Sequence, residues 1–265
     1  MDKFTILLAG DVMTGRGIDQ VLAQPGDRRC TLSALHAAGL RTAGAGSSAD
    51  LAWAPAGFDL GDGRRVLLFA CATGSSGVPS DWAAAPQRAG VALLPDLSDD
   101  TARQLADAAA RHRRGGDLSI LSIHWGGNWG TAIPAEHRRF AQRLVDLAAF
   151  DLVHGHSSHH PLAMEVYRGR LILYGCGDLI NDYEGIGAHG ALRSDIGCLY
   201  FVTLALPGAV LQGVRIVPLC LRRFRLERAD AAARQWVQEL LNDGGRSLGS
   251  RVEPAGGGAL TLRCG

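Results

Sequence analysis

The chain has 265 residues, enough for one large α/β domain or two small ones, and 47% of them are hydrophobic, so a substantial core can form. The 27 basic and 26 acidic residues leave a formal net charge of +1, and no Lys/Arg run with interleaved aromatic residues occurs. This balance excludes the usual electrostatic footprint of a nucleic-acid-binding protein, so we expect no nucleic-acid partner.

The N-terminus and the hydropathy pattern predict a cytoplasmic protein, with envelope association left open. The apolar stretch in MDKFTILLAGD is too short for a signal peptide and ends in an aspartate. No run of about 18 apolar residues occurs, so no transmembrane helix is expected. The six cysteines form no CxxC pair, and we expect no disulfide framework.

Short apolar runs bounded by Gly or Asp predict strands, and helical spacing of apolar residues between them predicts helices. In chain order we expect a strand over Phe4–Asp11, a helix over Thr31–Gly39, a strand over Arg64–Ala72, a helix over Asp99–Gly115, a strand over Leu118–Gly126, a helix over Pro134–Phe150, strands over Phe150–His156, Arg170–Asp178, Cys198–Leu206 and Gly213–Leu221, and a helix over Ala229–Asp243.

Strands that alternate with helices indicate an α/β fold with a mainly parallel central sheet. From residue 170 onward no helix separates the predicted strands, so antiparallel additions are expected there. Residues 1–225 are predicted to form the main domain, and residues 226–265 a C-terminal helix with a Gly-rich tail. We expect the tail, Arg246–Gly265, to be poorly ordered.

Polar residues follow several predicted strands, where ligands bind in open α/β sheets. Asp11 lies at the end of the first predicted strand, and His124 lies near the end of the third, Leu118–Gly126. The segment DLVHGHSSHH holds four of the nine histidines. A carboxylate and imidazoles that converge from strand ends are typical of a metal-dependent hydrolase. The candidate residues are Asp11, His124, His154, His156, His159, His160, Asp178 and Asn181.

Each of these signals also has a purely structural interpretation. Asp11 precedes a Gly-rich stretch and would suit a turn, and His124 could be a packing residue beside Trp125. The histidine-rich segment could be a solvated surface loop. Both interpretations of each residue stay open. The residues taken together favour a metal site more strongly than any one of them does alone.

Four motifs occur in the order of a known family: GDVMTGRG, LHAAGLRTAGAG, SIHWGGNW, and DLVHGHSSHHP with EVYRGRLILYGCGDLINDYEG. They resemble the CapA family of poly-γ-glutamate capsule synthesis proteins, which is related to the calcineurin-like metallophosphoesterases, over most of residues 4–225. The resemblance implies a metallophosphatase-like sandwich with its site at strand ends. It also implies that Asp11, His124, His156 and His159 occupy the metal positions.

The sequence departs from the family pattern near residues 18–30. Family members usually carry an Asn-Leu-Glu motif and an Asn-Asn-His motif after the first strand, and these supply further ligands. Here only IDQVLAQPGDRRC separates the GDVMTGRG motif from Thr31, and no asparagine precedes Asn128. This indicates an internal deletion of at least one strand–helix unit. A two-metal site needs ligands for both ions, so one ion fits the remaining residues better than two.

The resulting hypothesis is a CapA-type, phosphoesterase-like hydrolase that binds one divalent Mn, Fe or Zn ion. Mixed Asp/His ligation disfavours Mg or Ca. We expect Asp178 or Asn181 to orient ligands or substrate, and His154 or His160 to donate a proton to the leaving group. The first alternative is a non-catalytic scaffold that works with capsule-synthesis partners in envelope assembly. The second is a Gly-rich α/β domain of unknown binding role.

The hypothesis has a geometric consequence. One ion bound by both rings requires nitrogens of His124 and His156 within about 6 Å of each other. We expect His156 and His159 to reach the same ion, with Gly155 allowing a sharp turn between them and the strand. His154 should lie deeper on the same strand face, and His160, which precedes Pro161, should turn away.

Overall fold

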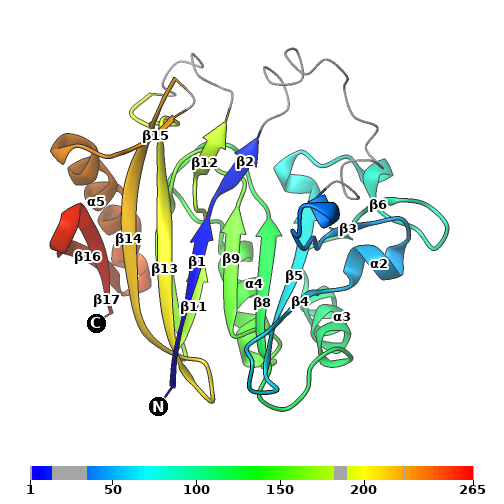
Figure 1. The fold of residues 1–265 in the computed structure, drawn as a ribbon. Helices are drawn as coiled ribbons and strands as arrows, with labels where there is room; N and C mark the ends of the chain where they lie inside the picture. The colour runs from blue at the N-terminus through cyan, green and yellow to red at the C-terminus, as the bar shows by residue number, and fades with distance from the viewer. Residues whose placement is uncertain (1, 14–34, 182–189, 224, 265) are drawn as a thin grey trace.

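The computed structural model describes residues 2–13, 35–181, 190–223 and 225–264, and within them the chain forms an α/β fold with two main sheets (Figure 1). The seven-stranded sheet has the order β10 (Met164–Tyr167), β11 (Arg170–Leu173), β9 (Leu152–His156), β8 (Leu118–His124), β5 (Arg65–Thr73) and β4 (Ala56–Asp59), with β7 (Leu93–Leu94) beside β5. The six-stranded sheet has the order β1 (Asp2–Ala9), β13 (Ile196–Leu206), β14 (Val210–Arg222), β17 (Ala259–Cys264) and β16 (Ser250–Ala255), with β15 (Arg225–Arg228) beside β14.

The seven-stranded sheet has a parallel centre, as the sequence predicts. Strands β5, β8, β9 and β11 pair in parallel, whereas β4 and β10 add antiparallel edges. Helices α3 (Asp99–Ala110) and α4 (Ala135–Asp146) pack on one face, and Ser98 is the N-cap of α3, with its hydroxyl accepting the Thr101 amide at 3.2 Å. The carboxyl ends of β8 and β9 therefore meet at one edge of this sheet.

The six-stranded sheet is antiparallel throughout, and here two sequence predictions are wrong. The first strand does not join the parallel sheet but pairs antiparallel with β13 over its whole length. The Gly-rich tail is not poorly ordered: β16 and β17 form an antiparallel pair that extends the sheet beyond β14. Apolar residues at alternate positions, such as Leu260 and Leu262, provide the packing against α5 (Ala231–Gly245) that holds the tail in place.

Two predicted strands are each divided in two. Phe4–Asp11 separates into β1 and β2 (Asp11–Met13), and Arg170–Asp178 separates into β11 and β12 (Asp178–Asn181), which pairs in parallel with β2. The remaining short elements are β3 (Ala45–Gly46), α2 (Ala49–Trp53), β6 (Gly90–Val91), and the 3-10 helices Gly74–Ser76, Ser80–Trp82, Arg246–Leu248 and Gly256–Gly258. The predicted deletion near residues 18–30 lies outside the described residues, as does the start of the predicted helix over Thr31–Gly39.

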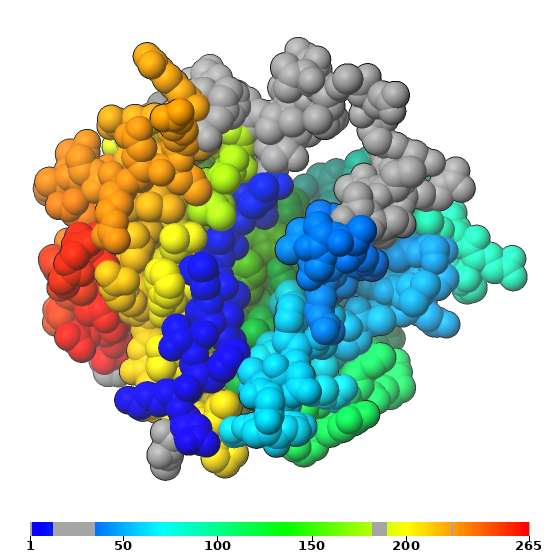
Figure 2. Space-filling view, in the orientation of Figure 1, coloured from blue at the N-terminus to red at the C-terminus, as the bar shows by residue number. Residues whose placement is uncertain are grey.

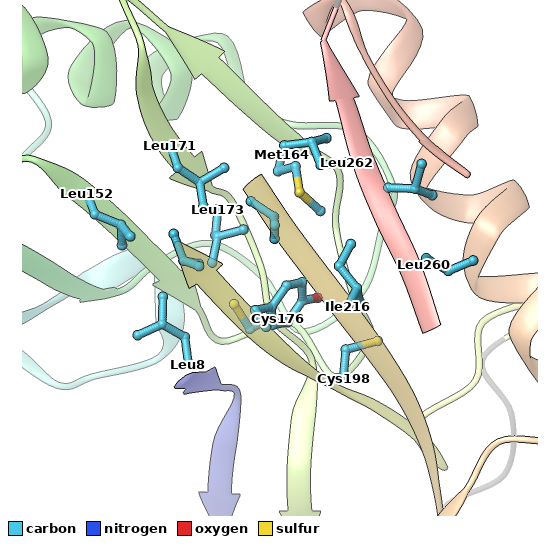
Figure 3. Packing of buried hydrophobic residues seen from close by; sticks show 14 of the residues in the cluster. Leu8, Leu152, Met164, Leu171, Leu173, Cys176, Cys198, Ile216, Leu260 and Leu262 are labelled. Carbon is cyan, nitrogen blue, oxygen red and sulfur yellow. The ribbon is translucent and has the colours of Figure 1, made fainter. Parts of the chain in front are cut away.

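The main core lies between the two sheets (Figure 3). Alternation along β8 places Leu118 and Ile120 in this inner core, whereas Leu121 and Ile123 face α3 and α4 on the other side. On strand β9, Leu152 likewise lies in the inner core, and Val153 faces the helices. The cysteines at 71, 176, 198 and 220 are free and buried. Among the described residues no helix is both long and apolar enough to cross a membrane.

Strand β1 forms the open edge of its sheet and lies at the surface (Figure 2). Its side chain at Leu7 is 53% exposed, whereas Leu8 is buried in the inner core. The strand thus covers the inner core with one face, and the chain then continues through Gly10 into β2 (Figure 1).

A buried carboxylate fixes helix α4 to the edge of the seven-stranded sheet. Glu165 on β10 is 3% exposed and accepts hydrogen bonds from Arg138 at 2.8 Å, Gln142 at 2.9 Å and the Tyr174 hydroxyl at 2.7 Å. Burial raises the pKa of Glu165, but the hydrogen bonds from Arg138, Tyr174 and Gln142 outweigh burial and hold it below its ordinary value.

Glu165→Ala should lower the free energy of unfolding by about 3 kcal/mol, because the partners of a buried charge lose their acceptor. The control is Arg103→Ala, which removes an exposed ion pair with Asp100 on α3 and should cost less than about 0.5 kcal/mol. Urea unfolding of both variants measures the difference. Equal losses from the two substitutions would contradict the structural role of Glu165.

The stabilisation from Glu165 should also depend on pH with a defined sign. Because the native state holds the pKa of this carboxyl below its ordinary value, the contribution is complete above that value and is lost as pH falls through the native pKa. The difference in unfolding free energy between wild type and Glu165→Gln should therefore shrink between about pH 6 and about pH 3. A difference that grows on acidification would contradict the assignment.

Candidate metal centre

The inner face of the seven-stranded sheet changes from apolar to polar toward the carboxyl ends of β8 and β9. On β8, Ser122 and His124 follow Ile120 at alternate positions, and on β9, His154 and His156 follow Leu152 in the same way. The parallel register pairs Ser122 with His154 and His124 with His156. Four polar side chains therefore form a compact block at the end of the inner core.

Asp11 reaches this block from β2, the short strand that follows the edge strand β1 of the six-stranded sheet. It follows Gly10 at the end of β1, and its backbone amide donates to the Gly177 carbonyl at 3.1 Å. A Cβ at Gly10 would lie 1.7 Å from the Gly177 oxygen, so no other residue permits this approach. The glycine thus places the Asp11 carboxylate over the ends of β8 and β9.

The three side chains of Asp11, His124 and His156 converge. Asp11 Oδ1 lies 2.7 Å from His156 Nδ1, and Asp11 Oδ2 lies 3.6 Å from His124 Nε2. One ligand atom from each residue lies within 4.8 Å of the other two, and all three residues are half-buried. The nitrogens of His124 and His156 are therefore closer than the predicted limit of about 6 Å.

Charge and hydrogen bonding at the cluster suit a cation. Asp11 is a carboxylate at neutral pH, and its two oxygens lie close to the imidazoles of His124 and His156. The buried Nδ1 atoms of His124 and His156 have no hydrogen-bond partner among the residues that the structure describes, although Asp11 lies close to the second. A carboxylate with two imidazoles matches the donor preference of divalent Mn, Fe or Zn, so these residues fit such an ion.

His159 lies outside this three-residue group. Its Nδ1 lies 2.9 Å from Asp178 Oδ2, and Asn181 donates its side-chain amide to the same oxygen. Asp178 on β12 is the register partner of Asp11 on β2, so the second cluster lies beside the first. The hydrogen bond to Asp178 raises the pKa of His159. The structure therefore joins three of the four predicted ligands and pairs the fourth, His159, with Asp178, to which Asn181 also donates.

The other two histidines of the segment are buried and hydrogen-bonded. His154 is 8% exposed, with Nε2 at 3.0 Å from the Ala9 carbonyl and Nδ1 at 3.2 Å from Ser122 Oγ. Burial lowers the pKa of His154 to about 3. His160 is fully buried, and its Nδ1 lies 3.1 Å from the Pro161 carbonyl. His154 thus lies deeper than His156, as predicted.

Two residues at the site escaped the sequence analysis. Ser122 lies 2.9 Å from His156 Nε2, and the two-residue spacing from His124 on a strand could have identified it. No sequence pattern identifies Trp125 as a residue of the site. Its amide donates to the His156 carbonyl at 3.1 Å, and its indole donates to the Tyr174 carbonyl at 3.0 Å. Its ring stacks on His137 of α4 with centroids 4.5 Å apart.

Trp125 also explains Gly155, for which the sequence suggested a sharp turn. Gly155 is part of strand β9 and has no positive φ, so that explanation is wrong. A Cβ there would lie 2.5 Å from the Trp125 indole nitrogen and 2.6 Å from the Leu173 carbonyl. The glycine is needed for close packing, and the packing fixes the backbone on which His156 stands.

Comparison with known proteins agrees with the motif pattern. A family model described as bacterial capsule synthesis protein PGA_cap matches residues 28–183. Two proteins of Mycobacterium tuberculosis, the probable polyglutamine synthesis accessory proteins MT0602 (strain CDC 1551 / Oshkosh) and Rv0574c (strain ATCC 25618 / H37Rv), are each 42% identical over 223 residues. The match covers 84% of this chain and 58% of each relative, so the chain spans little more than half the length of these relatives.

A solved structure of GAP50, the anchor in the inner membrane complex of Plasmodium, aligns with 10% identity and a TM-score of 0.33 over 71% of this chain and 59% of its own. That similarity is too low to support a conclusion. The family match and the 42% identity are sufficient, and they confirm the resemblance carried by the motifs. The chain belongs to the family of bacterial capsule synthesis proteins described as PGA_cap.

Proposed function

We propose that the chain is a metal-dependent, phosphoesterase-like hydrolase of the CapA type that acts in the synthesis of poly-γ-glutamate capsule or a related envelope polymer. The convergence of Asp11, His124 and His156 is the observation that carries the proposal. The family membership and the relatives described as probable polyglutamine synthesis accessory proteins support the biological setting. The substrate is a small molecule or a polymer with a bond open to hydrolysis.

The proposed ligands of a single divalent ion are the Asp11 carboxylate, His124 Nε2 and His156 Nδ1. Mn, Fe or Zn held there would polarise a phosphoryl or carbonyl oxygen and lower the pKa of a bound water. We further propose that the two sheets are a shortened metallophosphatase-like sandwich, which lacks the strand–helix unit that would supply ligands for a second ion.

His159 and Asp178 form the best-placed pair for proton transfer beside the ion. Asp178 orients the His159 ring, and Asn181 fixes the same Asp178 oxygen, so the imidazole is held in one orientation. In this proposal His159 donates a proton to the leaving group. The proton-donor role predicted for His154 or His160 is left out, because both rings are buried and hydrogen-bonded to backbone carbonyls.

The second candidate is a non-catalytic scaffold that contacts other capsule-synthesis proteins. The description of the Mycobacterium relatives as accessory proteins favours it, as does the short segment near residues 18–30. In this case the metal centre would stabilise the fold without turning over a substrate. Metal content and turnover distinguish the two functions.

Asp11→Ala and His156→Ala should each lower the affinity for Mn²⁺ or Zn²⁺ at least tenfold, about 1.4 kcal/mol, because each removes a direct ligand. His159→Ala should change the affinity less, since its Nδ1 is engaged by Asp178. Isothermal titration calorimetry at fixed pH measures the three values. The control is His112→Ala, an exposed histidine elsewhere on the chain, which should bind as wild type does.

Stoichiometric metal with unchanged affinity in Asp11→Ala and His156→Ala would contradict the ligand assignment. A tenfold loss in His159→Ala equal to theirs would return His159 to the ligand set that the sequence predicts. His160→Ala should leave the affinity almost unchanged, because its ring turns toward the Pro161 carbonyl.

With Mn²⁺ the wild-type chain should hydrolyse bis(p-nitrophenyl) phosphate, and a chelator should abolish the activity. His159→Asn should lower kcat by about a hundredfold for an alkyl phosphodiester, whose alkoxide has to be protonated as it leaves, while metal affinity stays near that of wild type. Hydrolysis of bis(p-nitrophenyl) phosphate should change far less, because p-nitrophenolate leaves without a proton. Release of the alcohol or of p-nitrophenolate is the readout. A chain that binds one ion and turns over neither phosphodiesters nor phosphomonoesters would support the scaffold function instead.

A further inference from the structure

A continuous hydrogen-bonded chain leads from the backbone of β1 to the metal centre. It begins at the Ala9 carbonyl, 3.0 Å from His154 Nε2, and continues from His154 Nδ1 to Ser122 Oγ over 3.2 Å. Ser122 Oγ then lies 2.9 Å from His156 Nε2. The remaining nitrogen of His156, Nδ1, faces Asp11 Oδ1 at 2.7 Å.

We propose that Ser122 and His154 are positioning residues that fix the tautomer of His156, so that its Nδ1 lone pair faces Asp11 and is available to a cation. The inference rests on the metal site of the proposed function and adds two residues that act through His156. Neither Ser122 nor His154 belongs to the ligand group.

The Ala9 carbonyl, at the start of the hydrogen-bonded chain, sets the direction of every hydrogen bond that follows. A backbone carbonyl can only accept, so His154 carries its proton on Nε2 and donates it to Ala9. His154 is buried, and its two nitrogens face a carbonyl and a hydroxyl, both uncharged, which favours the neutral ring. A neutral ring protonated at Nε2 has an acceptor at Nδ1.

Ser122 transmits this direction because a hydroxyl has a single proton. Once that proton is donated to His154 Nδ1, Ser122 Oγ can only accept from His156, so the His156 proton is held on Nε2. The Nδ1 atom of neutral His156 then carries a lone pair. It faces the Asp11 carboxylate, which is also an acceptor, and the two atoms are not in hydrogen-bond geometry.

Two acceptors at this distance repel each other unless a cation lies between them. We call the hydrogen-bonded chain from the Ala9 carbonyl through His154 and Ser122 to His156 Nε2 the relay. Without the relay, Asp11 would draw the His156 proton to Nδ1 and form a carboxylate–imidazole hydrogen bond that competes with metal. The relay thus keeps the ligand atom in its binding form before the ion arrives. Partners of this kind, which orient a ligating histidine through its other nitrogen, change metal affinity by about ten- to hundredfold.

The first measurement is the tautomer of His156 in the metal-free protein. Long-range ¹H–¹⁵N spectra distinguish a protonated from an unprotonated ring nitrogen, and they should be recorded with a chelator at about pH 8, above the ordinary histidine pKa. Wild type should show His156 protonated at Nε2. Ser122→Ala and His154→Phe should move the proton to Nδ1 and lower Mn²⁺ or Zn²⁺ affinity by about ten- to hundredfold.

Two matched variants separate the relay from a loss of folding. Ser122→Thr keeps the hydroxyl and should retain both the wild-type tautomer and the affinity. Ser119→Ala removes a buried hydroxyl from the same strand, one that bonds the Ala149 carbonyl at 3.0 Å, and should lower stability without changing tautomer or affinity. His154→Phe tests the relay from its far end, because it removes the acceptor of the Ser122 proton and leaves the Ser122 hydroxyl in place.

His156 protonated at Nδ1 in metal-free wild type would overturn the relay, as would an unchanged tautomer and affinity in Ser122→Ala. Failure of the proposed function gives a different result. A wild type that binds no metal, but whose His156 tautomer switches in Ser122→Ala, would retain the relay and remove the metal site. A wild type that binds metal with His156 protonated at Nδ1 would do the reverse.

Discussion

The close approach of two backbones at Gly10 and Gly177 is the constraint on which the site depends. It brings the end of an antiparallel strand over the ends of two parallel strands, and thereby places one carboxylate against two imidazoles. The two sheets bury a common apolar core, and that burial supplies the free energy that holds Asp11 so close to His156. Any side chain at Gly10 would separate β2 from β12 and withdraw Asp11 from the site.

The same inner face serves packing and chemistry in succession. Leu118 and Ile120 pack between the sheets, and the next two inward positions of β8 are Ser122 and His124. A buried polar group has to be hydrogen-bonded, and the cross-strand register meets this requirement by placing Ser122 opposite His154. The polar block is therefore stable without solvent, and its hydrogen bonds have fixed directions. Within this block the Nδ1 atoms of His124 and His156 lack a hydrogen-bond partner among the described residues, and the second of them faces Asp11.

Support for the site extends to the outer layer of the protein. The Tyr174 hydroxyl donates to Glu165, whose other partners lie on α4, and the Tyr174 carbonyl accepts the Trp125 indole. Trp125 in turn holds the His156 carbonyl. A helix on the far face of the sheet is thus linked to the backbone of a proposed metal ligand through buried hydrogen bonds and stacked rings. Such support keeps ligand atoms within the narrow range of positions that metal coordination requires.

The sequence by itself determined the α/β class, the parallel centre, the candidate residues and the family. These depend on local periodicity, on the residues at strand ends and on motifs that can be recognised without a structure. Alternation along β8 and β9 even fixes which side chains share a face. The tertiary structure alone decided that β1 pairs with β13 in a second sheet, that the Gly-rich tail forms two strands, and that His159 turns to Asp178 rather than to Asp11. It also revealed Trp125 and the reason for Gly155. These features arise from contacts between residues far apart in the chain, and no local pattern encodes which strand edge, carboxylate or ring will lie opposite another.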